Sequence, residues 1–260
     1  MIRIAAATLL IALTSAAHAA PDAEPATVAA MALTPFSAAA GAALPPPWRV
    51  VGLPGNKVPP AQIDIFALGS DRVLRLRTDR SYGTASHALP PKTPAGALTW
   101  RWRLDQPIEA ADLRKKEGDD AALKVCAMFD MPLDRLGFVE RNVLRLARSA
   151  SGEYLPAATL CYVWDHKLPV GTELANAYTK RVRFVVVDSA TNAPKPASPL
   201  QQWVSHTRDL RADFLKAFGA ESDTVPPLLA IVVGADSDNT GQSSLGYVGD
   251  VSLTPLPAQP

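Results

Sequence analysis

The sequence predicts a mainly β fold, a jelly-roll-like antiparallel β-sandwich with two short helices. Three observations support this prediction: the apolar runs are short, several alternate with polar residues, and Pro or Gly stands between them. Many short strands separated in this way are typical of sandwiches and barrels. We expect strands at 48–53, 62–68, 72–78, 85–89, 97–105, 122–129, 159–164, 181–188, 202–207, 228–235 and 245–253.

Two of these strands indicate a sheet with one buried and one wet face. Within 72–78, apolar residues alternate with arginines, and Gly69-Ser70-Asp71 in front of it predicts a tight hairpin turn. Trp100 and Trp102 share one face of their strand, and the arginine that follows each of them lies on the other face. We therefore expect the tryptophan face to be buried and the arginine face to meet solvent.

Two helices interrupt the strands. In 132–148, apolar residues recur with helical spacing and form one stripe: Leu136, Val139, Val143 and Leu146. The arginines of this segment lie on another face, which we interpret as solvated surface: Arg141, Arg145 and Arg148. The second helix, 209–218, begins at Asp209, a good N-cap, and stops at Gly219. It directs three apolar side chains inward, Leu210, Phe214 and Phe218.

The N-terminal region predicts export. Residues 1–19 are typical of a signal peptide, because an apolar run too short to span a bilayer precedes the cleavage pattern Ala17-His18-Ala19. Residues 20–47 are mostly Ala and Pro, and we interpret them as a flexible tether. A single β-sandwich domain is expected over 48–256. The mature protein would be periplasmic or secreted from a bacterium, with no transmembrane segment after cleavage.

The charge balance narrows the class of partner. Cleavage would remove Arg3 and no acidic residue, so that 25 basic and 25 acidic residues remain. A net charge near zero argues against a nucleic-acid partner and against a polybasic membrane module. Apolar residues make up 48% of the chain, which is enough for a full core.

The two cysteines, Cys126 and Cys161, lie in neither a CxxC motif nor a Cys/His metal spacing. Both fall within strand-like runs that could be neighbours in a sheet. An oxidising compartment would allow them to form a disulfide, and two buried free thiols are the alternative.

The segment from Asp236 to Asp250 carries the most distinctive polar motif. Asp236-x-Asp238-x-Thr240 resembles a phosphatase nucleophile motif, but only 20 residues follow Thr240, too few for the rest of that fold. It also matches the first half of a calcium loop, yet Tyr247 replaces the bidentate Glu, which excludes an EF-hand. We favour a hairpin turn. The alternative is a looser calcium site, the only cofactor considered, with ligands Asp236, Asp238 and Asp250.

A second acidic motif, Gly118-Asp119-Asp120, precedes the strand 122–129. Neighbouring strand residues point to opposite faces, so within a strand the two acids could not serve one site. Among the aromatic residues we expect Trp100 and Trp203 to be buried and Tyr178 to be exposed. Carboxylates, amides and aromatic faces together are a common recipe for a sugar pocket. Our candidate ligand-binding residues are Asp119, Asp120, Trp164, Tyr178, Asp238 and Asn239.

Several motifs in a fixed order resemble one family. They are WRW (100–102), GDDAALKVCAMFD (118–130), TLCYVWDHKLPVGT (159–172), NAYTKRVRFVVV (176–187), RDLRADFLKAFG (208–219) and DSDNTGQSSLGYVGDVSL (236–253). In this order they resemble the exported bacterial domain-of-unknown-function 3047 family, from about Trp48 to Leu253. The resemblance implies no established activity. Its closing strand is similar to that of jelly-roll modules that bind carbohydrate, an analogy between folds.

Three functions follow as hypotheses. We expect the two acidic motifs to meet, with Tyr178 or Trp164 beside them, and to bind a glycan, a cell-envelope polymer or another polyhydroxylated ligand. The first alternative is a jelly-roll polysaccharide lyase or glycoside hydrolase that uses Asp119 or Asp120, Tyr178 and His166. The second is a structural or adhesive envelope protein, in which the acids only hold the loops together. The catalytic residues stay unassigned, and a binder is preferred to an enzyme.

Overall fold

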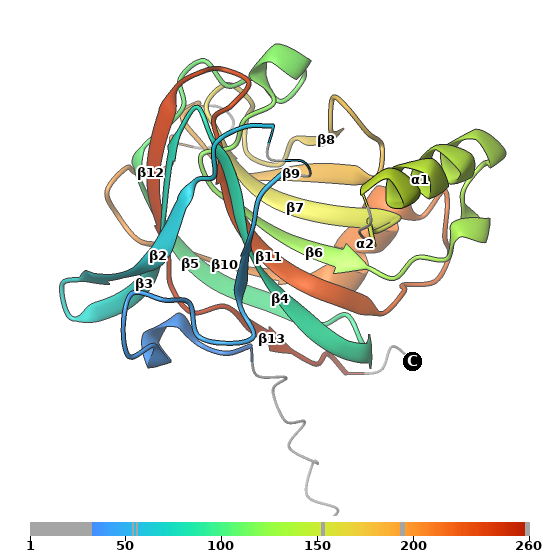
Figure 1. The fold of residues 1–260 in the computed structure, drawn as a ribbon, viewed down its shortest axis with the longest axis horizontal. Helices are drawn as coiled ribbons and strands as arrows, with labels where there is room; N and C mark the ends of the chain where they lie inside the picture. Colours follow the sequence, from blue (N-terminus) through green and yellow to red (C-terminus); the bar gives the residue numbers. More distant parts are fainter. Residues whose placement is uncertain (1–32, 54, 56, 152–153, 193–195, 258–260) are drawn as a thin grey trace, which may run out of the picture.

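Two β-sheets pack face to face in the computed structural model, which describes residues 33–257 apart from 54, 56, 152–153 and 193–195 (Figure 1). The seven-stranded sheet has the order β1 (Arg49–Val51), β4 (Tyr82–Thr93), β11 (Leu228–Asp236), β6 (Lys124–Phe129), β7 (Ala158–Asp165), β9 (Val182–Ser189) and β8 (Glu173–Ala175). The other sheet has the order β10 (Val204–Asp209), β5 (Ala97–Gln106), β12 (Ser243–Val248), β3 (Asp71–Asp79) and β2 (Gln62–Leu68), with β13 (Ser252–Thr254) paired to β5.

The predicted β-sandwich is therefore confirmed. Its strands pair antiparallel except β7 and β9, which run parallel. The predicted strand 245–253 is divided at Gly249 into β12 and β13, and the short edge strand β8 was not predicted. No helix among the described residues is both long and apolar enough to cross a membrane.

The main core lies between the two sheets. On β5, Leu98, Trp100, Trp102 and Leu104 are buried in alternation with partly exposed residues, as the period of two predicts. Trp100 stacks on Tyr162 of the facing sheet with ring centroids 5.2 Å apart. Full burial of each such side chain contributes about 1.5–3 kcal/mol to folding. Trp203 differs from expectation: it is partly exposed, and the Arg101 guanidinium lies over its ring.

A second, smaller apolar layer covers the outer face of the seven-stranded sheet. Val125 points into the main core, so its neighbour Cys126 points outward, directly opposite Cys161 on β7. The two cysteines form a disulfide, which confirms one of the two predicted alternatives. Leu113 and Leu168, from the loops that cross this face, pack on the same layer. The loop that contains Leu113 also carries the acidic motif Gly118-Asp119-Asp120.

The helix α2 (Leu210–Phe218) forms as predicted. The Asp209 carboxylate accepts hydrogen bonds from the backbone N–H groups of Arg211 and Ala212, which makes it the N-cap. Leu210, Phe214 and Phe218 are buried, and Phe214 packs on Phe129 of β6 with ring centroids 4.7 Å apart.

The helix α1 (Phe138–Ser151) presents the opposite face from the one its pattern suggests. Leu136 is buried, but Val139, Val143 and Leu146 are 71%, 62% and 71% exposed. Leu144, from outside the stripe, is buried instead. The helix lies at the edge of the sandwich, at the right of the view (Figure 1).

Polar contacts explain this orientation of α1. Buried Arg181 pairs with Glu140, which draws the polar face of the helix toward the protein. The guanidinium groups of Arg141 and Arg148 donate to the backbone carbonyls of Leu136 and Leu155. Two of the three arginines assigned to a solvated surface are therefore partly buried, and Arg145 is the exposed one.

Residues 33–47 belong to the folded domain, although we assigned them to the tether. Leu33 and Phe36 are buried, and Phe36 packs on Trp48 with ring centroids 4.7 Å apart. The 3₁₀ turn Phe36–Ala38 is held by Asp250, whose carboxylate accepts hydrogen bonds from the backbone N–H and hydroxyl of Ser37. The signal peptide, 1–19, and the rest of the tether, 20–32, lie outside the described residues.

One contact of this N-terminal segment is sensitive to pH. The Thr34 backbone N–H donates to Nε2 of buried His87 at 3.2 Å, so this nitrogen must be unprotonated. Burial lowers the pKa of His87 below its ordinary value of 6.5. The unfolded chain therefore takes up a proton at a higher pH than the folded chain, and stability that is present above pH 6.5 is lost as the pH falls through and below it.

Relative to His87→Gln, whose amide oxygen can accept the same hydrogen bond without titrating, the wild type should therefore show a larger decrease, or a smaller increase, in the free energy of unfolding between neutral pH and pH 5. Urea denaturation at several pH values measures both. An unchanged pH dependence in His87→Gln would assign the decrease to other groups.

Candidate functional site

The seven-stranded sheet places the side chains of Tyr82, Lys124 and Asp236 on its outer face, near one end of β11. In the register, Asp236 lies opposite Tyr82 of β4, and Gly234 lies opposite Lys124 of β6. A Cβ at Gly234 would lie 2.7 Å from Thr84 Cγ2 and 3.2 Å from Lys124 Cε. Because Gly234 has no side chain, the Lys124 side chain fits beside β11 and its ammonium reaches Asp236.

Asp120 joins the two acidic motifs. Its side chain is buried, and its carboxylate accepts hydrogen bonds from the backbone N–H groups of Asn239 (3.1 Å) and Thr240 (2.7 Å). The Asn239 side-chain amide donates to the Asp119 carbonyl at 3.0 Å. The loop before β6 and the loop after β11 are therefore held together by Asp120.

Lys124 supplies a buried positive charge. Its Nζ lies 2.9 Å from Asp236 Oδ1 and 4.8 Å from the centre of the Tyr82 ring. Burial alone would lower the pKa of Lys124, but the neighbouring carboxylates, Asp236 first among them, raise it above its ordinary value. The ammonium is therefore charged at neutral pH. Asp236 Oδ1 also accepts a hydrogen bond from the Ala121 backbone N–H.

Asp119 is buried, with 7% of its surface exposed, and is only half satisfied. Its Oδ2 accepts a hydrogen bond of 2.5 Å from the Asn176 side chain, while Oδ1 has no hydrogen-bond partner among the described residues. Burial raises the pKa of Asp119 to about 6. Asp238 is half-buried, and its Oδ1 is likewise enclosed without a donor among the residues that the structure describes.

Tyr178 forms the exposed rim of this cluster, with 59% of its surface exposed. Its hydroxyl lies 3.0 Å from Asn239 Oδ1 and 3.2 Å from the Lys116 carbonyl oxygen. Asn176 Oδ1 accepts hydrogen bonds from the backbone N–H groups of Tyr178 and Thr179, which fixes the turn that carries the ring. Asp119, through Asn176, and Asp120, through Asn239, therefore both position Tyr178. We call the residues Asp119, Asp120, Lys124, Asn176, Tyr178, Asp236, Asp238 and Asn239 the acidic cluster.

Five of the six candidate ligand residues meet in the acidic cluster, and Trp164 does not. The Trp164 side chain is buried in the core, so its ring has no free face for a ligand. Asp119 and Asp120 both reach the cluster because they precede the strand, which begins at Lys124. We expected that the two acids could not share a site, but that argument holds only for residues within a strand, and both precede β6.

The metal candidates also change. Asp250 binds Ser37 on another part of the domain, and the third carboxylate beside Asp236 and Asp238 belongs to Asp120. One carboxylate oxygen from each of these three lies within 4.8 Å of the others. Lys124 and Asn176 were missed, although a lone lysine in the apolar run 122–129 was a usable signal.

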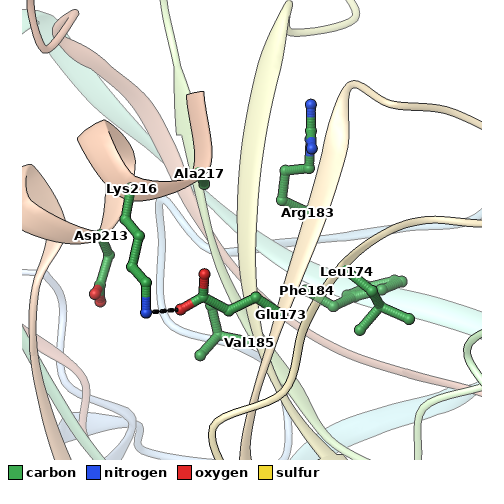
Figure 2. Close-up of a pocket in the computed structure, with 8 residues that line it drawn as sticks. All are labelled: Glu173, Leu174, Arg183, Phe184, Val185, Asp213, Lys216 and Ala217. Atoms are coloured by element: carbon green, nitrogen blue, oxygen red, sulfur yellow. Dashed lines mark ion pairs between the residues drawn. The ribbon is translucent and has the colours of Figure 1, made fainter. Parts of the chain in front are cut away.

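A separate hollow lies between α2 and the strands β8 and β9, with a volume of about 220 Å³. In Figure 2, Lys216 extends from α2 toward Glu173 of β8, and a dashed line marks their ion pair. The Lys216 Nζ and Glu173 Oε1 atoms are 2.5 Å apart. None of the candidate ligand residues lines it; its walls are Glu173, Leu174, Arg183, Phe184, Val185, Asp213, Lys216 and Ala217.

Comparison with solved structures finds distant likenesses, each with a TM-score below 0.5. TmCBM61 in complex with β-1,4-galactotriose is 11% identical, with 81% of this chain and 90% of that chain covered and a TM-score of 0.33. The K1 cleaved adhesin domain of Lys-gingipain from Porphyromonas gingivalis W83 is 10% identical, with 85% and 96% covered and a TM-score of 0.35. The cellulose-induced protein Cip1 is 9% identical, with 82% and 94% covered and a TM-score of 0.39.

No curated protein matches the sequence. The model of the family "Protein of unknown function (DUF3047)" matches residues 46–252, which include the strands β1 to β12, the two helices and the whole acidic cluster. The chain therefore belongs to the DUF3047 family.

Proposed function

We propose that the protein is exported to the periplasm or secreted, and that it binds a glycan or another polyhydroxylated polymer at the rim of the acidic cluster. One observation carries this proposal: Tyr178 is an exposed aromatic ring whose hydroxyl and backbone are both held by polar side chains of the cluster. A fixed, exposed ring can stack on the apolar face of a sugar at little entropic cost.

The neighbours of Tyr178 supply the polar half of such a site. Asp238 and Asn239 are partly exposed, and the Lys116 ammonium lies 5.3 Å from the centre of the Tyr178 ring. Carboxylate and amide oxygens can accept hydrogen bonds from sugar hydroxyls, and an ammonium can donate to them. Asp119 and Asp120 are buried and hold Asn176 and Asn239, so in this proposal they position the site without touching the ligand.

The test is isothermal titration calorimetry with a panel of envelope and plant glycans. Tyr178→Ala should weaken binding about tenfold, from the lost stacking contact. Tyr154→Ala is the matched control, because Tyr154 is equally exposed, at 60%, but lies beside Arg148 near α1. No binding to any glycan, or an equal loss in both variants, would contradict the proposal.

The same glycan panel distinguishes the two alternative functions, an enzyme that cleaves polysaccharides and a structural or adhesive envelope protein. Release of reducing ends or of unsaturated products would indicate a hydrolase or a lyase. A panel without binding or turnover, together with a lower melting temperature in Asp120→Asn, would favour the structural envelope protein.

A further inference from the structure

We infer that Asp120, Asp236 and Asp238 together hold a hard divalent cation, and that calcium suits the site best. The three carboxylates lie close enough to share one ion, since an oxygen of each is within 4.8 Å of the others. This inference does not depend on glycan binding at the rim.

The charge in the cluster is unbalanced. Asp119, Asp120, Asp236 and Asp238 act electrostatically on one another, and Lys124 is the cation that acts on Asp119, Asp236 and Asp238. Four carboxyl groups thus surround one ammonium group, that of Lys124. Asp119, Asp120 and Asp236 are buried, where uncompensated charge is costly. A divalent cation would cancel most of the excess.

Two buried carboxylate oxygens indicate that a partner is missing. Asp119 Oδ1 and Asp238 Oδ1 are both enclosed by protein, and neither receives a hydrogen bond from any described residue. Buried carboxylate oxygens in folded proteins nearly always have a donor or a metal ion. Asp238 belongs to the proposed site, and Asp119 adjoins Asp120 and is acted on by the charge of Asp236.

The donor set selects the type of cation. The site offers carboxylate oxygens and neither sulfur nor imidazole, a set that suits calcium and magnesium and disfavours zinc. Asp236 ends β11 and Asp238 follows it, in the spacing of a calcium loop that lacks its final Glu. Asp120 brings the missing carboxylate from a distant part of the chain, while its hydrogen bonds to Asn239 and Thr240 shape the loop. Calcium tolerates such irregular ligand geometry better than magnesium does.

The experiment titrates the protein with calcium chloride alone, by calorimetry, and records melting curves with calcium and with a chelator. Calcium should raise the melting temperature of the wild type, and the chelator should reverse the rise. Asp238→Asn should weaken calcium binding at least about tenfold, because it removes a direct ligand. Asp238 is half-buried and its carboxylate is not part of the loop's hydrogen bonds to Asp120, so this variant should fold.

Asp250→Asn is the matched control. It makes the same chemical change, and its carboxylate binds Ser37 instead of the cluster, so it should lower the melting temperature without altering the response to calcium. A wild type that neither binds calcium nor melts higher in its presence would overturn the inference, as would an equal loss of response in Asp250→Asn. A stronger response to magnesium chloride would overturn the choice of calcium. The calcium titration contains no glycan, so its outcome is independent of whether the protein binds a glycan at the rim.

Discussion

Replacing both Cys126 and Cys161 by Ala should lower the free energy of unfolding by about 4 kcal/mol. The disulfide joins residues that are 35 apart in sequence and so closes a loop of that length in the unfolded chain. Without the bond, the unfolded chain gains conformational freedom, and the chain-entropy model gives the quoted loss. For a domain of this size the melting temperature should fall by about 10 °C. Urea denaturation of the wild type and the double variant measures the difference.

Part of that loss could come from packing, because both cysteines lie in the outer apolar layer. Val232→Ala is a suitable control: it removes two methyl groups from the same layer, cuts no cross-link, and should cost about 2 kcal/mol. The wild type under reducing conditions should then approach the double variant. If the double variant loses no more than Val232→Ala, the disulfide contributes little beyond its packing.

The fold was largely predictable because its signals are local. The alternation in β5 reports which side chains face the core, and the Asp209 cap together with three apolar residues defines α2. The turn between β2 and β3 uses Gly69 at a positive φ of 65°, which the Gly69-Ser70-Asp71 motif anticipates. In each case the residues that decide the structure lie within one turn or strand.

The sequence-based predictions were wrong where a residue distant in the chain determines the local structure. The orientation of α1 depends on Arg181, which is buried beside Glu140 and Glu221 and far from both in sequence. Periodicity finds the apolar stripe of a helix, but it cannot show that an ion pair turns the other face inward. The segment 33–47 was misassigned because its average composition is that of a linker, while Leu33 and Phe36 lie in the core and Ser37 is bound by Asp250 from the far end of the chain.

The acidic cluster was predictable in part, because its motifs are local but their contact is long-range. Its acidic residues were identifiable because each motif is polar and adjoins an apolar run. Their meeting depends on β6 and β11 being neighbours, although more than ninety residues separate them in the sequence. Trp164 was the wrong aromatic choice since strand alternation places it in the core, and Tyr178, in a loop, was the right one for exposure.

Lys124→Met should be among the most damaging single substitutions, with an expected loss of about 3–5 kcal/mol in the free energy of unfolding at neutral pH. The ammonium is buried 2.9 Å from Asp236 Oδ1, and its removal leaves the carboxylates of the cluster without their compensating charge. Methionine keeps most of the side-chain volume, so lost packing should add little. Urea denaturation measures the loss.

Lys216→Met separates the effect of burial from that of the ion pair itself. The Lys216–Glu173 distance is 2.5 Å, shorter than that of Lys124–Asp236, but the Lys216 side chain is 67% exposed and its charge is solvated in either state. Its loss should therefore cost less than about 1 kcal/mol. In the double variant Lys124→Met/Asp236→Asn, part of the stability should return, because the uncompensated carboxylate is gone. Equal losses for the two lysines would show that the cluster is hydrated well enough to carry its negative charge without Lys124.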